Sequence, residues 1–495
     1  MSAMKPVNHH TAILFLAGIC LMLLQFFMIR EISAILRGTE VVILLVTISY
    51  FTGYSVGYAL SGSFSLAGLR LLALVFWMLH ITLPFSLRYF SAMLHERSPG
   101  WSFAFIIFFA MFLLSSFYSL LLPWFIDREG GGTSLARLYG AELAGAMAGA
   151  VGAMTLGAYP MAQPLLYQVS LAGVLLLLWP KKRMGVAVAL GLAVYCLAFQ
   201  SLERGSLVAH YVKGIHFQQA EPLLSVNSPY QKVDFLRSGL TGKTYIFLDG
   251  NMNFGSTSLE HFNTFLSRLP AGLIRPENAL VIGAGSLQSL RNVAPHTGHV
   301  DVVEIDGAVV EGSRRFLADI NRLDTISNWS LTIQDAKYYL GSTDKRYDLI
   351  VVDVPAPLSI QLGLLHSVEF YTLAKSRLTP KGVLSVSLSG SFGKTATTPK
   401  TVAAAALAVF EEAFLVAPDI PGRSFALAGR SLPFGREDIE RASVELGHKN
   451  TIIYDKAEAE LMVGDTEPIS LDHLSYPVKR SFSLFIKRHI TGETP

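Results

Sequence analysis

The stretch ALVIGAGSLQ at residues 279–288, followed by HVDVVEID at residues 299–306, decides how the C-terminal half of this chain folds. It predicts a buried strand, a glycine turn that opens a helix, and a second strand that ends in acidic residues. Gly283 and Gly285 carry no Cβ, so the backbone of the turn can approach a ligand closely. Glu304 can accept hydrogen bonds from both hydroxyls of a ribose. The arrangement therefore indicates a site for a nucleoside-containing cofactor.

The composition divides the chain of 495 residues into two parts of different character. This length exceeds one ordinary hydrophobic core, so at least two domains are expected. Apolar residues make up 51% of the chain and are concentrated in its N-terminal part, where charges are few. The net charge of +3 gives no argument for a nucleic-acid partner. Cys20 and Cys196 both lie in apolar segments, which argues against a disulfide framework or a metal cluster.

The N-terminal part has the pattern of membrane-spanning helices. Seven apolar stretches are long enough to cross about 30 Å of hydrocarbon, the last of them barely so; they lie at 12–35, 41–61, 69–90, 102–125, 136–158, 163–180 and 184–202. Soluble helices rarely follow one another in this way without a polar face. No small-residue cleavage site follows the first stretch, which is therefore predicted to be a retained anchor. The sequence predicts a seven-span helical bundle in a lipid bilayer.

The fifth stretch carries two features beyond hydrophobicity. Ala141, Gly145 and Gly149 recur every four residues, with Gly152 nearby, and this stripe of small residues permits close contact between helices. Glu142 opens the same stretch, and an acid at membrane depth is costly unless it is paired. Glu142 is therefore either a functional residue or an interfacial one that pairs with Arg137. The same choice applies to Arg30 and Glu31 at the end of the first stretch.

The C-terminal part has the pattern of an α/β domain. Residues 203–227 are expected to connect the two parts, and the alternating runs 230–236 and 243–248 flank SGLTG as in a small β-hairpin. A helix-like run at 258–269 follows. Strands are predicted at 279–283, 300–305, 330–334, 348–353 and 382–388, and helices near 286–295, 307–318, 368–378 and 400–414. This alternation is typical of a parallel sheet covered on both faces.

Three acidic residues follow predicted strands and should line one crevice. Glu304, Asp335 and Asp353 lie at strand ends, and ligands of such sheets bind at the carboxyl ends near the reversal of strand order. The turn from Gly283 to Gln288 lacks the third glycine of the dinucleotide fingerprint, so S-adenosylmethionine or a relative fits better than a dinucleotide. Asp335 is placed to accept a hydrogen bond from an adenine amino group.

With these motifs in order, the chain resembles the spermidine synthase (polyamine aminopropyltransferase) family, and more closely its bacterial members fused to an N-terminal multi-span membrane domain. The resemblance covers roughly 225–430 well and the membrane part more loosely. It rests on the segments Ser228–Gln231, Leu248–Gly250, Val281–Gly285, Val303–Asp306, Asp335–Ala336, Tyr347–Asp353, Glu369–Tyr371 and Leu378–Gly382, with Leu138–Glu142 in the membrane part.

The resemblance implies transfer of an aminopropyl group from decarboxylated S-adenosylmethionine to an amine, without a metal. On that pattern Glu304 binds the ribose, Asp335 with Ala336 binds the adenine, and Gln231 lies near the tail of the cofactor. Soluble relatives are oligomeric, which makes a homodimer plausible by analogy. The resemblance also implies a multi-pass protein of the bacterial inner (cytoplasmic) membrane. By a small margin of charge, the positive-inside rule alone places the C-terminal domain outside the cytoplasm. A cofactor made in the cytosol argues for the reverse, so the soluble domain is expected to face the cytoplasm.

The departures from the family pattern concern the amine side of the site. The Asp-x-x-Asp-Pro motif reads Asp353-Val354-Pro355-Ala356-Pro357, so Ala356 stands at the position of the catalytic aspartate. An alkylamine must lose a proton before it attacks the sulfonium carbon, and a carboxylate assists that loss whereas alanine does not.

Other acceptor-side positions of the family are replaced as well, by Ser258, Asn263 and Thr264. Glu260 and His261 lie close by in the sequence and can substitute after a small shift in register. His366 follows Ala356 by ten residues, where the family has a lid over the pocket, and is either a site residue or a loop histidine without a task.

Three functions stay open at this point. The first is an aminopropyltransferase with a rearranged acceptor site, in which Asp353, Glu260 or Tyr230 supplies the polar contact. The second is another alkyl or methyl transfer from an S-adenosyl donor. The third is a non-catalytic nucleoside sensor or scaffold in the membrane, that is, a pseudoenzyme.

The predicted organisation has four parts. A transmembrane helical domain occupies 1–202, and a linker with a β-hairpin substrate-side subdomain occupies 203–277. A Rossmann-like α/β methyltransferase-type domain occupies 278–435. A tail at 436–495 is expected to pack on that domain or on the membrane.

Overall fold

The structure is a computed structural model that describes residues 6–37, 40–95, 100–129, 132–157, 159–217, 219–255 and 263–491. The chain forms two compact units. The first unit comprises Met1–Gly242, Phe247–Asn251 and Leu484–Pro495, and the second comprises Lys243–Ile246 and Met252–Ser483. The segment 203–277, expected to form one subdomain, is thus divided between the two units.

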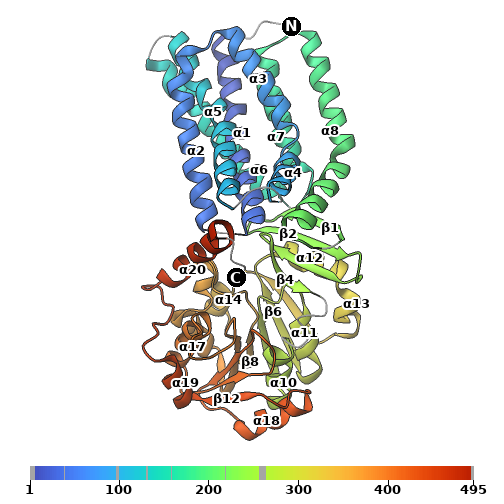
Figure 1. Cartoon of the computed structure of the whole chain (residues 1–495), viewed down its shortest axis with the longest axis vertical. Coiled ribbons are helices and arrows are strands. Elements are labelled where there is room, and N and C mark those ends of the chain that lie inside the picture. Colours follow the sequence, from blue (N-terminus) through green and yellow to red (C-terminus); the bar gives the residue numbers. More distant parts are fainter. Residues whose placement is uncertain are drawn as a thin grey trace. The chain divides into compact units, whose positions relative to one another are not determined.

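The first unit is built mainly from helices, drawn in blue to green in Figure 1. They are α1 (Pro6–Leu36), α2 (Glu40–Leu60), α3 (Leu66–His80), α4 (Phe85–His95), α5 (Gly100–Glu129), α6 (Gly132–Leu156), α7 (Ala162–Leu178) and α8 (Lys182–Ala209). By length and composition, four helices of the described chain can cross a membrane, or five if one bent pair counts as a single span. The predicted count of seven spans is therefore not confirmed.

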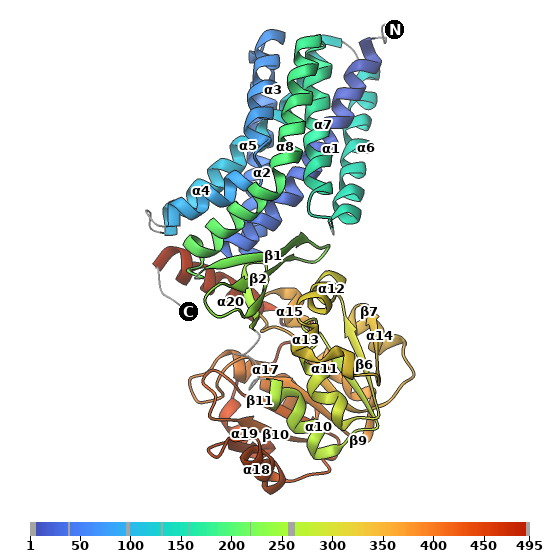
Figure 2. The same ribbon diagram turned by 90° about the vertical axis from the view of Figure 1, so that its right-hand side faces the viewer.

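The bent pair corrects the third predicted span. The stretch 69–90 was expected to be one helix, but α3 ends at His80 and α4 begins at Phe85, and their axes differ by 67°. The change of direction is visible in Figure 2. Pro84 has no backbone N–H to donate to a preceding carbonyl, which interrupts the helix at this point. A count of apolar residues does not detect such a break.

Helix α8 corrects the last predicted span and the connection after it. The helix runs to Ala209 rather than ending near residue 202, and a π-helical turn, η2 (His210–Gly214), continues it. The carboxylate of Glu203 lies inside this extension and accepts a hydrogen bond from Arg88 on α4 at 2.7 Å. The segment 203–227 is therefore helix and strand rather than an open linker.

Helices α1 and α6 pack closely through the small residues predicted to form a stripe. A Cβ built on Gly145 would lie 1.9 Å from the Phe15 carbonyl oxygen, and one on Gly149 would lie 2.8 Å from that of Ile19. The contact is reciprocal, since a Cβ on Gly18 would lie 2.0 Å from the Glu142 carbonyl oxygen. The spacing of small residues thus determines how near the two backbones come.

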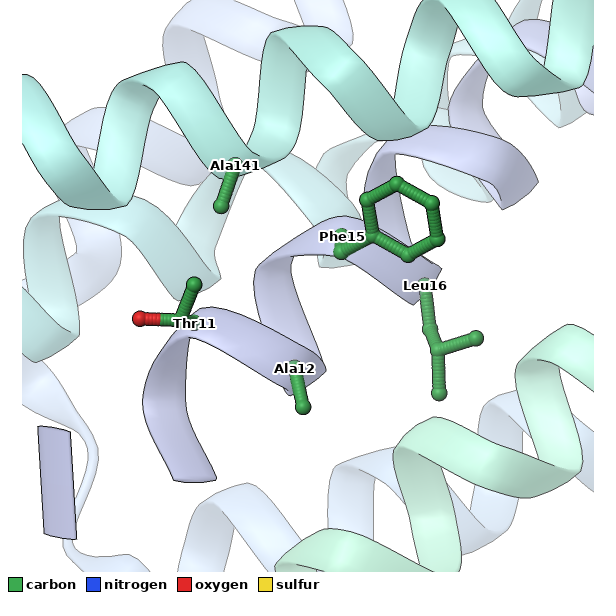
Figure 3. Close-up of a pocket in the computed structure, with 5 residues that line it drawn as sticks. All are labelled: Thr11, Ala12, Phe15, Leu16 and Ala141. Atoms are coloured by element: carbon green, nitrogen blue, oxygen red, sulfur yellow. The ribbon is translucent and has the colours of Figure 1, made fainter. Parts of the chain in front are cut away.

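Next to this contact lies an open and largely apolar hollow, shown in Figure 3, that is lined by Thr11, Ala12, Phe15, Leu16 and Ala141.

A buried network of charges joins the helices of the first unit to its first strands. The Arg88 guanidinium donates to both oxygens of Glu31 at 2.8 Å, and Lys232 donates to Glu31 at 2.7 Å. These three side chains are at most 3% exposed. With Glu203, two carboxylates meet two cations, so the network is balanced in charge. The predicted candidate Glu31 is thus fully paired inside the protein.

The predicted hairpin is part of a four-stranded sheet with the order β1-β2-β3-β4. Its strands are β1 (Ala220–Asn227), β2 (Lys232–Ser238), β3 (Thr244–Leu248) and β4 (Asn251–Gly255), and β1 pairs with β2 in antiparallel register. Gly242 adopts a φ of +67° between β2 and β3 and donates to the Ser238 carbonyl, as expected of a turn residue.

The second unit contains an eight-stranded sheet with the order β12-β10-β11-β9-β8-β5-β6-β7. The strands are β5 (Asn278–Ile282), β6 (His299–Glu304), β7 (Trp329–Ile333), β8 (Tyr347–Val352), β9 (Leu378–Ser387), β10 (Glu412–Ala417), β11 (Phe425–Gly429) and β12 (Ile452–Asp455). Strands β5 to β9 pair in parallel, which confirms the predicted parallel sheet. Strands β10, β11 and β12 extend it in antiparallel pairing and were not predicted.

Helices cover both faces of this sheet because its strands are apolar on both sides. Leu280 and Ile282 of β5 join a core with the helices α14 (Ala336–Ser342), α16 (Val368–Ser376), α17 (Thr398–Val409) and α19 (Lys456–Val463). Ala279 and Val281 join a second core with α10 (Leu269–Ile274), α11 (Gln288–Val293), α12 (Gly307–Phe316) and α18 (Arg436–Glu445). The period-two alternation therefore fills two cores at once.

One further expectation needs correction. The helix predicted at 258–269 is observed as η3 (Thr264–Arg268) with α10, and residues 256–262 lie outside the described part. Arg275 in left-handed conformation, followed by Pro276, ends it. The segment 436–495, expected to pack on the α/β domain or on the membrane, contributes α18, β12 and α19 to the second unit, followed by α20 (Ser475–Ile486) and η6 (Lys487–Thr491).

The contact between α1 and α6 predicts opposite effects for two glycines of the same helix. We expect Gly145→Ala to lower the free energy of unfolding by about 1–3 kcal/mol, because its methyl group must push the Phe15 backbone away. Gly140→Ala meets open space and should be neutral or slightly stabilising, because alanine favours helix. Thermal unfolding of the two variants in detergent measures the difference. Equal melting temperatures would contradict the close contact.

Candidate functional site

The reversal of strand order in the second unit lies between β5 and β8. From β5 the chain adds β6 and β7 on one side and then returns to add β8 on the other. Gly283 directly follows β5 and Asp353 directly follows β8, and the Asp353 amide donates to the Ile282 carbonyl at 2.8 Å. Both predicted residues therefore lie at the position where such sheets bind ligands.

The glycine turn requires glycine at its first position. Gly283 has a φ of +79°, and a Cβ there would lie 2.7 Å from the Asp353 carbonyl oxygen. The turn is closed by a hydrogen bond from the Gly285 amide to the Gly283 carbonyl at 2.9 Å. Asn321 of α13 (Ala318–Asn321) donates to the Ser286 carbonyl at 2.7 Å and was not predicted as a support of the turn.

Gly285 and Glu304 share one small space. A Cβ on Gly285 would lie 3.1 Å from Oε2 of Glu304 and 2.7 Å from a methyl group of Val309. The other carboxylate oxygen, Oε1, accepts a hydrogen bond from the Asp306 amide at 3.0 Å. The structure thus brings together the glycine turn and the acid predicted to bind a ribose, with Oε2 next to the turn.

The surroundings of Glu304 disfavour its charged form. The residue is 8% exposed, and among the described residues no lysine or arginine forms an ion pair with it. Burial raises the pKa of Glu304 to about 7, and repulsion from Asp306 and Asp353 adds to the increase. A ligand that donates hydrogen bonds to this carboxylate would stabilise its ionised form.

Asp335 and Ala336 lie at the end of the neighbouring strand, β7. Gln334 donates from its amide to the Glu304 carbonyl at 2.9 Å, so the ends of β6 and β7 are adjacent. Oδ1 of Asp335 caps α14 by accepting hydrogen bonds from the amides of Lys337 and Tyr338 at 2.8 and 3.2 Å. The predicted contact with adenine would therefore use Oδ2.

Asp353 is held by residues that were not predicted to act together. Ser289 of α11 donates to Oδ2 of Asp353 at 2.6 Å. Oδ1 of Asn263 lies 3.0 Å from the same hydroxyl, and its amide nitrogen hydrogen-bonds Gln288. Burial raises the pKa of Asp353 to about 6, while the bond from Ser289 opposes the rise. The position of Ser289 one turn after Gly285 was the only sequence signal for this contact.

The loop after Asp353 is fixed by His366. Nε2 of His366 lies 3.0 Å from the Pro355 carbonyl oxygen and must donate to it, because a carbonyl only accepts. Nδ1 then accepts a hydrogen bond from the Tyr371 hydroxyl at 3.0 Å. Burial lowers the pKa of His366 to about 4, consistent with this neutral form. His366 therefore holds the loop that carries Ala356.

The remaining predicted residues lie in the first unit or outside the described part of the chain. Tyr230 and Gln231 belong to the first unit, where the amide of each donates to the Ser228 hydroxyl. Glu260 and His261 lie outside the described residues. No group of three or more His, Cys, Asp or Glu side chains that can hold a metal ion occurs in the described ranges.

The sheet order, the glycine turn and the two covered faces define the second unit as a Rossmann-like α/β domain. Residues 257–417, which include β5 to β10, match the spermine/spermidine synthase domain. This part of the chain is therefore similar to the spermine/spermidine synthase family.

Curated relatives include polyamine aminopropyltransferases. That of Thermoplasma volcanium is 31% identical over 180 residues, which cover 36% of this chain and 65% of the relative. Polyamine aminopropyltransferase 1 of Streptomyces coelicolor is 32% identical over 183 residues, 35% of this chain and 34% of the relative. The chain thus spans just under two thirds of the first relative and about a third of the second. A spermidine synthase in complex with the transition-state analogue AdoDATO superimposes with a TM-score of 0.41 and 20% identity, covering 55% of this chain and 88% of that one.

The raised pKa of Glu304 predicts how nucleoside binding depends on pH. Ribose hydroxyls need the ionised carboxylate as an acceptor, so we expect the affinity for 5′-methylthioadenosine to rise about tenfold from pH 6 to pH 8. Glu304→Gln should weaken binding at pH 8 by at least about tenfold and abolish the pH dependence. Calorimetric titration of the full chain measures both, with the exposed Glu311→Gln as the control.

Glu304→Gln should weaken nucleoside binding but increase the stability of the protein. The folded-state pKa of Glu304 lies above its ordinary value of 4.5, so its contribution to stability is present below that value and is lost as the pH rises through 7. Glu304→Gln should therefore stabilise the protein at pH 8, by up to about 3 kcal/mol. A flat affinity profile in the unaltered protein, or a destabilised variant, would contradict the environment described for Glu304.

The contacts of His366 predict a graded loss of stability. His366→Phe leaves the Pro355 carbonyl and the Tyr371 hydroxyl without their partner, at a cost of about 1–3 kcal/mol. Tyr371→Phe removes only one of the two hydrogen bonds and should cost about 1 kcal/mol. Chemical denaturation of the full chain at pH 7 gives both values. Similar losses in the two variants would argue against the role of His366 in fixing the loop.

Proposed function

We propose that this protein transfers an aminopropyl group from decarboxylated S-adenosylmethionine to an amine. The observation that carries the proposal is the adjacency of the Glu304 carboxylate to the glycine turn at the point of strand reversal, within the segment that matches the synthase domain. In this proposal Glu304 accepts hydrogen bonds from the ribose, Asp335 with Ala336 contacts the adenine, and Asp353 faces the reacting groups.

The charge of the site supports a cationic donor. Glu304, Asp306 and Asp353 lie close together, and among the described residues Glu304 and Asp353 form no ion pair with a basic side chain. A donor that carries a sulfonium and an ammonium group, but no carboxylate, complements this negative surface. The same donor with a carboxylate attached would face repulsion from it.

The transfer itself needs a proton acceptor for the incoming amine. The amine nitrogen attacks the propyl carbon next to sulfur, the C–S bond breaks with its electron pair left on sulfur, and 5′-methylthioadenosine departs. The amine loses one proton in the process. With Ala356 at the usual carboxylate position, Asp353 is the acidic residue proposed to take that proton, since with a pKa of about 6 it is ionised at neutral pH.

We also propose that the first unit anchors this domain in a lipid bilayer, with the domain on the cytoplasmic side. Four to five apolar helices of sufficient length support the anchor. The availability of a cytosolic nucleoside donor supports the orientation.

A second candidate function is favoured by one specific feature. Ala356 presents a methyl group where the family pattern has its catalytic carboxylate, and His366 holds this loop in place. A domain that retains the nucleoside side of the site and lacks the amine side is suited to sensing a nucleoside without turnover.

Product analysis distinguishes the candidates. The full-length chain in detergent is incubated with decarboxylated S-adenosylmethionine and putrescine, and we expect spermidine and 5′-methylthioadenosine in equal amounts. Asp353→Asn and Glu304→Gln should each reduce the rate at least about tenfold, because each removes a charge proposed to act on substrate. The exposed Glu311→Gln serves as the matched control and should keep the full rate.

If the unaltered protein forms no spermidine, the variant Ala356→Asp shows whether the missing carboxylate is the reason. Turnover only in this variant would mean that the natural chain binds the nucleoside without this chemistry. A methylated amine formed from S-adenosylmethionine would instead assign a different transfer. If the unaltered protein and all variants form no spermidine and bind no nucleoside, the proposal is overturned.

A further inference from the structure

Glu142 is a buried acid of the first unit whose charge is not matched inside the protein. The side chain lies on α6 and is 4% exposed. Its Oε1 accepts a hydrogen bond from the Tyr54 hydroxyl on α2 at 3.2 Å, whereas its Oε2 is buried without a hydrogen-bond partner. The sequence left open a pairing with Arg137, but Arg137 is exposed and forms no ion pair with Glu142 in the described residues.

The same unit shows how a buried carboxylate is treated when its role is structural. Both oxygens of Glu31 accept hydrogen bonds from Arg88, and Lys232 adds a second cation at 2.7 Å. Glu142 has a comparable degree of burial and no cation of this kind. Because a buried unpaired carboxylate is costly, Glu142 requires either a proton or a positively charged ligand.

The side chains around Glu142 favour an organic cation. Tyr50, Tyr54 and Tyr58 follow one another at four-residue spacing on α2, with ring centroids 6.2 and 5.1 Å apart. The Glu142 carboxylate interacts electrostatically with the hydroxyls of all three. Aromatic faces attract ammonium groups, and a neighbouring carboxylate adds direct charge pairing. We call these three residues the tyrosine ladder.

The tyrosine ladder also connects the interior of the unit with its surface, and the distance between its rings suits a linear chain with several amino groups. Tyr50 is 8% exposed and Tyr58 is 38% exposed, so the ladder leads from the interior of the unit to its surface. Its steps match the separation of amino groups that are joined by a propyl or butyl chain. A compact inorganic cation would use the carboxylate alone and would gain little from a series of rings.

We propose that Glu142 and the tyrosine ladder bind the ammonium group of a linear polyamine in the helical unit. The choice of a polyamine among organic ammonium ions rests on the proposed function, in which such an amine is acceptor or product. The site itself rests on the unpaired carboxylate and the aromatic rings. In this site the ammonium pairs with Oε2 of Glu142 and the remaining chain lies along the rings.

Equilibrium dialysis of radiolabelled spermidine against the full-length protein in detergent tests the proposal. We expect Glu142→Gln to lose one bound equivalent of spermidine, or at least about tenfold in affinity, because the charge partner is gone. Tyr54→Phe retains the ring and should weaken binding only a few-fold. Asp127→Asn, which removes an exposed acid of α5, should bind as the unaltered protein does. Thermal unfolding confirms that each variant is folded.

Three results would overturn the proposal. They are no spermidine binding by the unaltered protein, equal binding by Glu142→Gln, and displacement by sodium ions as effective as displacement by a second polyamine. The last would assign the carboxylate to an inorganic cation.

Transferase activity measured on the same preparations separates this proposal from the preceding one. Glu142→Gln should still form product at the full rate, since Glu142 is not part of the proposed catalytic site. Spermidine binding that depends on Glu142 in a protein without turnover would refute the proposed function and leave the site in place. Turnover without Glu142-dependent spermidine binding would refute the polyamine site and leave the proposed function in place.

Discussion

The space between Gly285 and the carboxylate of Glu304 is the constraint on which the candidate site depends. It exists because residue 285 has no Cβ, which would otherwise lie 3.1 Å from Oε2 of Glu304 and in close contact with Val309. The strand that ends in Glu304 and the helix that follows the turn are both fixed by apolar cores on the two faces of the sheet. Rigid elements therefore hold an acid beside a turn that only glycine can form, as a preorganised binding site requires.

Four buried carboxylates of this chain differ in the partners that surround them, and these differences indicate their roles. Glu31 is matched by two cations and stabilises the connection between helices and the first strands. Asp353 and Glu304 are held by hydrogen bonds from Ser289 and from the Asp306 amide, which orient them without neutralising them. Glu142 has one tyrosine and an unpartnered oxygen. An acid that the protein orients but does not neutralise is available to a ligand.

Much of the second unit could be predicted because its sequence signals are local. Short apolar runs that alternate with helices led directly to the parallel strands β5 to β9, and acids after three of them led to Glu304, Asp335 and Asp353. The antiparallel strands β10 to β12 were missed. The helix predicted near 400–414 runs over the first residues of β10, and β12 has only four residues. Their place in the sheet depends on pairing between distant segments, which periodicity does not report.

Other features could not be predicted because they arise from tertiary contacts. The break at Pro84 falls within a continuous apolar stretch, so a hydropathy count merges α3 and α4. The contact of Ser289 with Asp353 joins residues 64 positions apart, and the pairing of Lys232 with Glu31 spans 201 positions. Nothing in the sequence near these residues distinguishes them from the polar residues that any protein carries on its surface.

The proposed aminopropyl transfer does not require a carboxylate at residue 356. A proton acceptor for an amine must be ionised at neutral pH and must be held at the reacting atoms. A carboxylate at another position of the chain can meet both conditions if the fold places it there. Asp353 begins the same loop and has a pKa of about 6, so it is ionised at neutral pH. Ser289 fixes one of its oxygens, which leaves the other for a substrate. His366 holds the Pro355 carbonyl, and the Ala356 carbonyl accepts a hydrogen bond from the Leu358 amide at 2.7 Å, a backbone contact that does not use the side chain at residue 356. In the proposed function, an alanine at that position therefore alters the acceptor side of the site, while the contacts that position Asp353 stay the same.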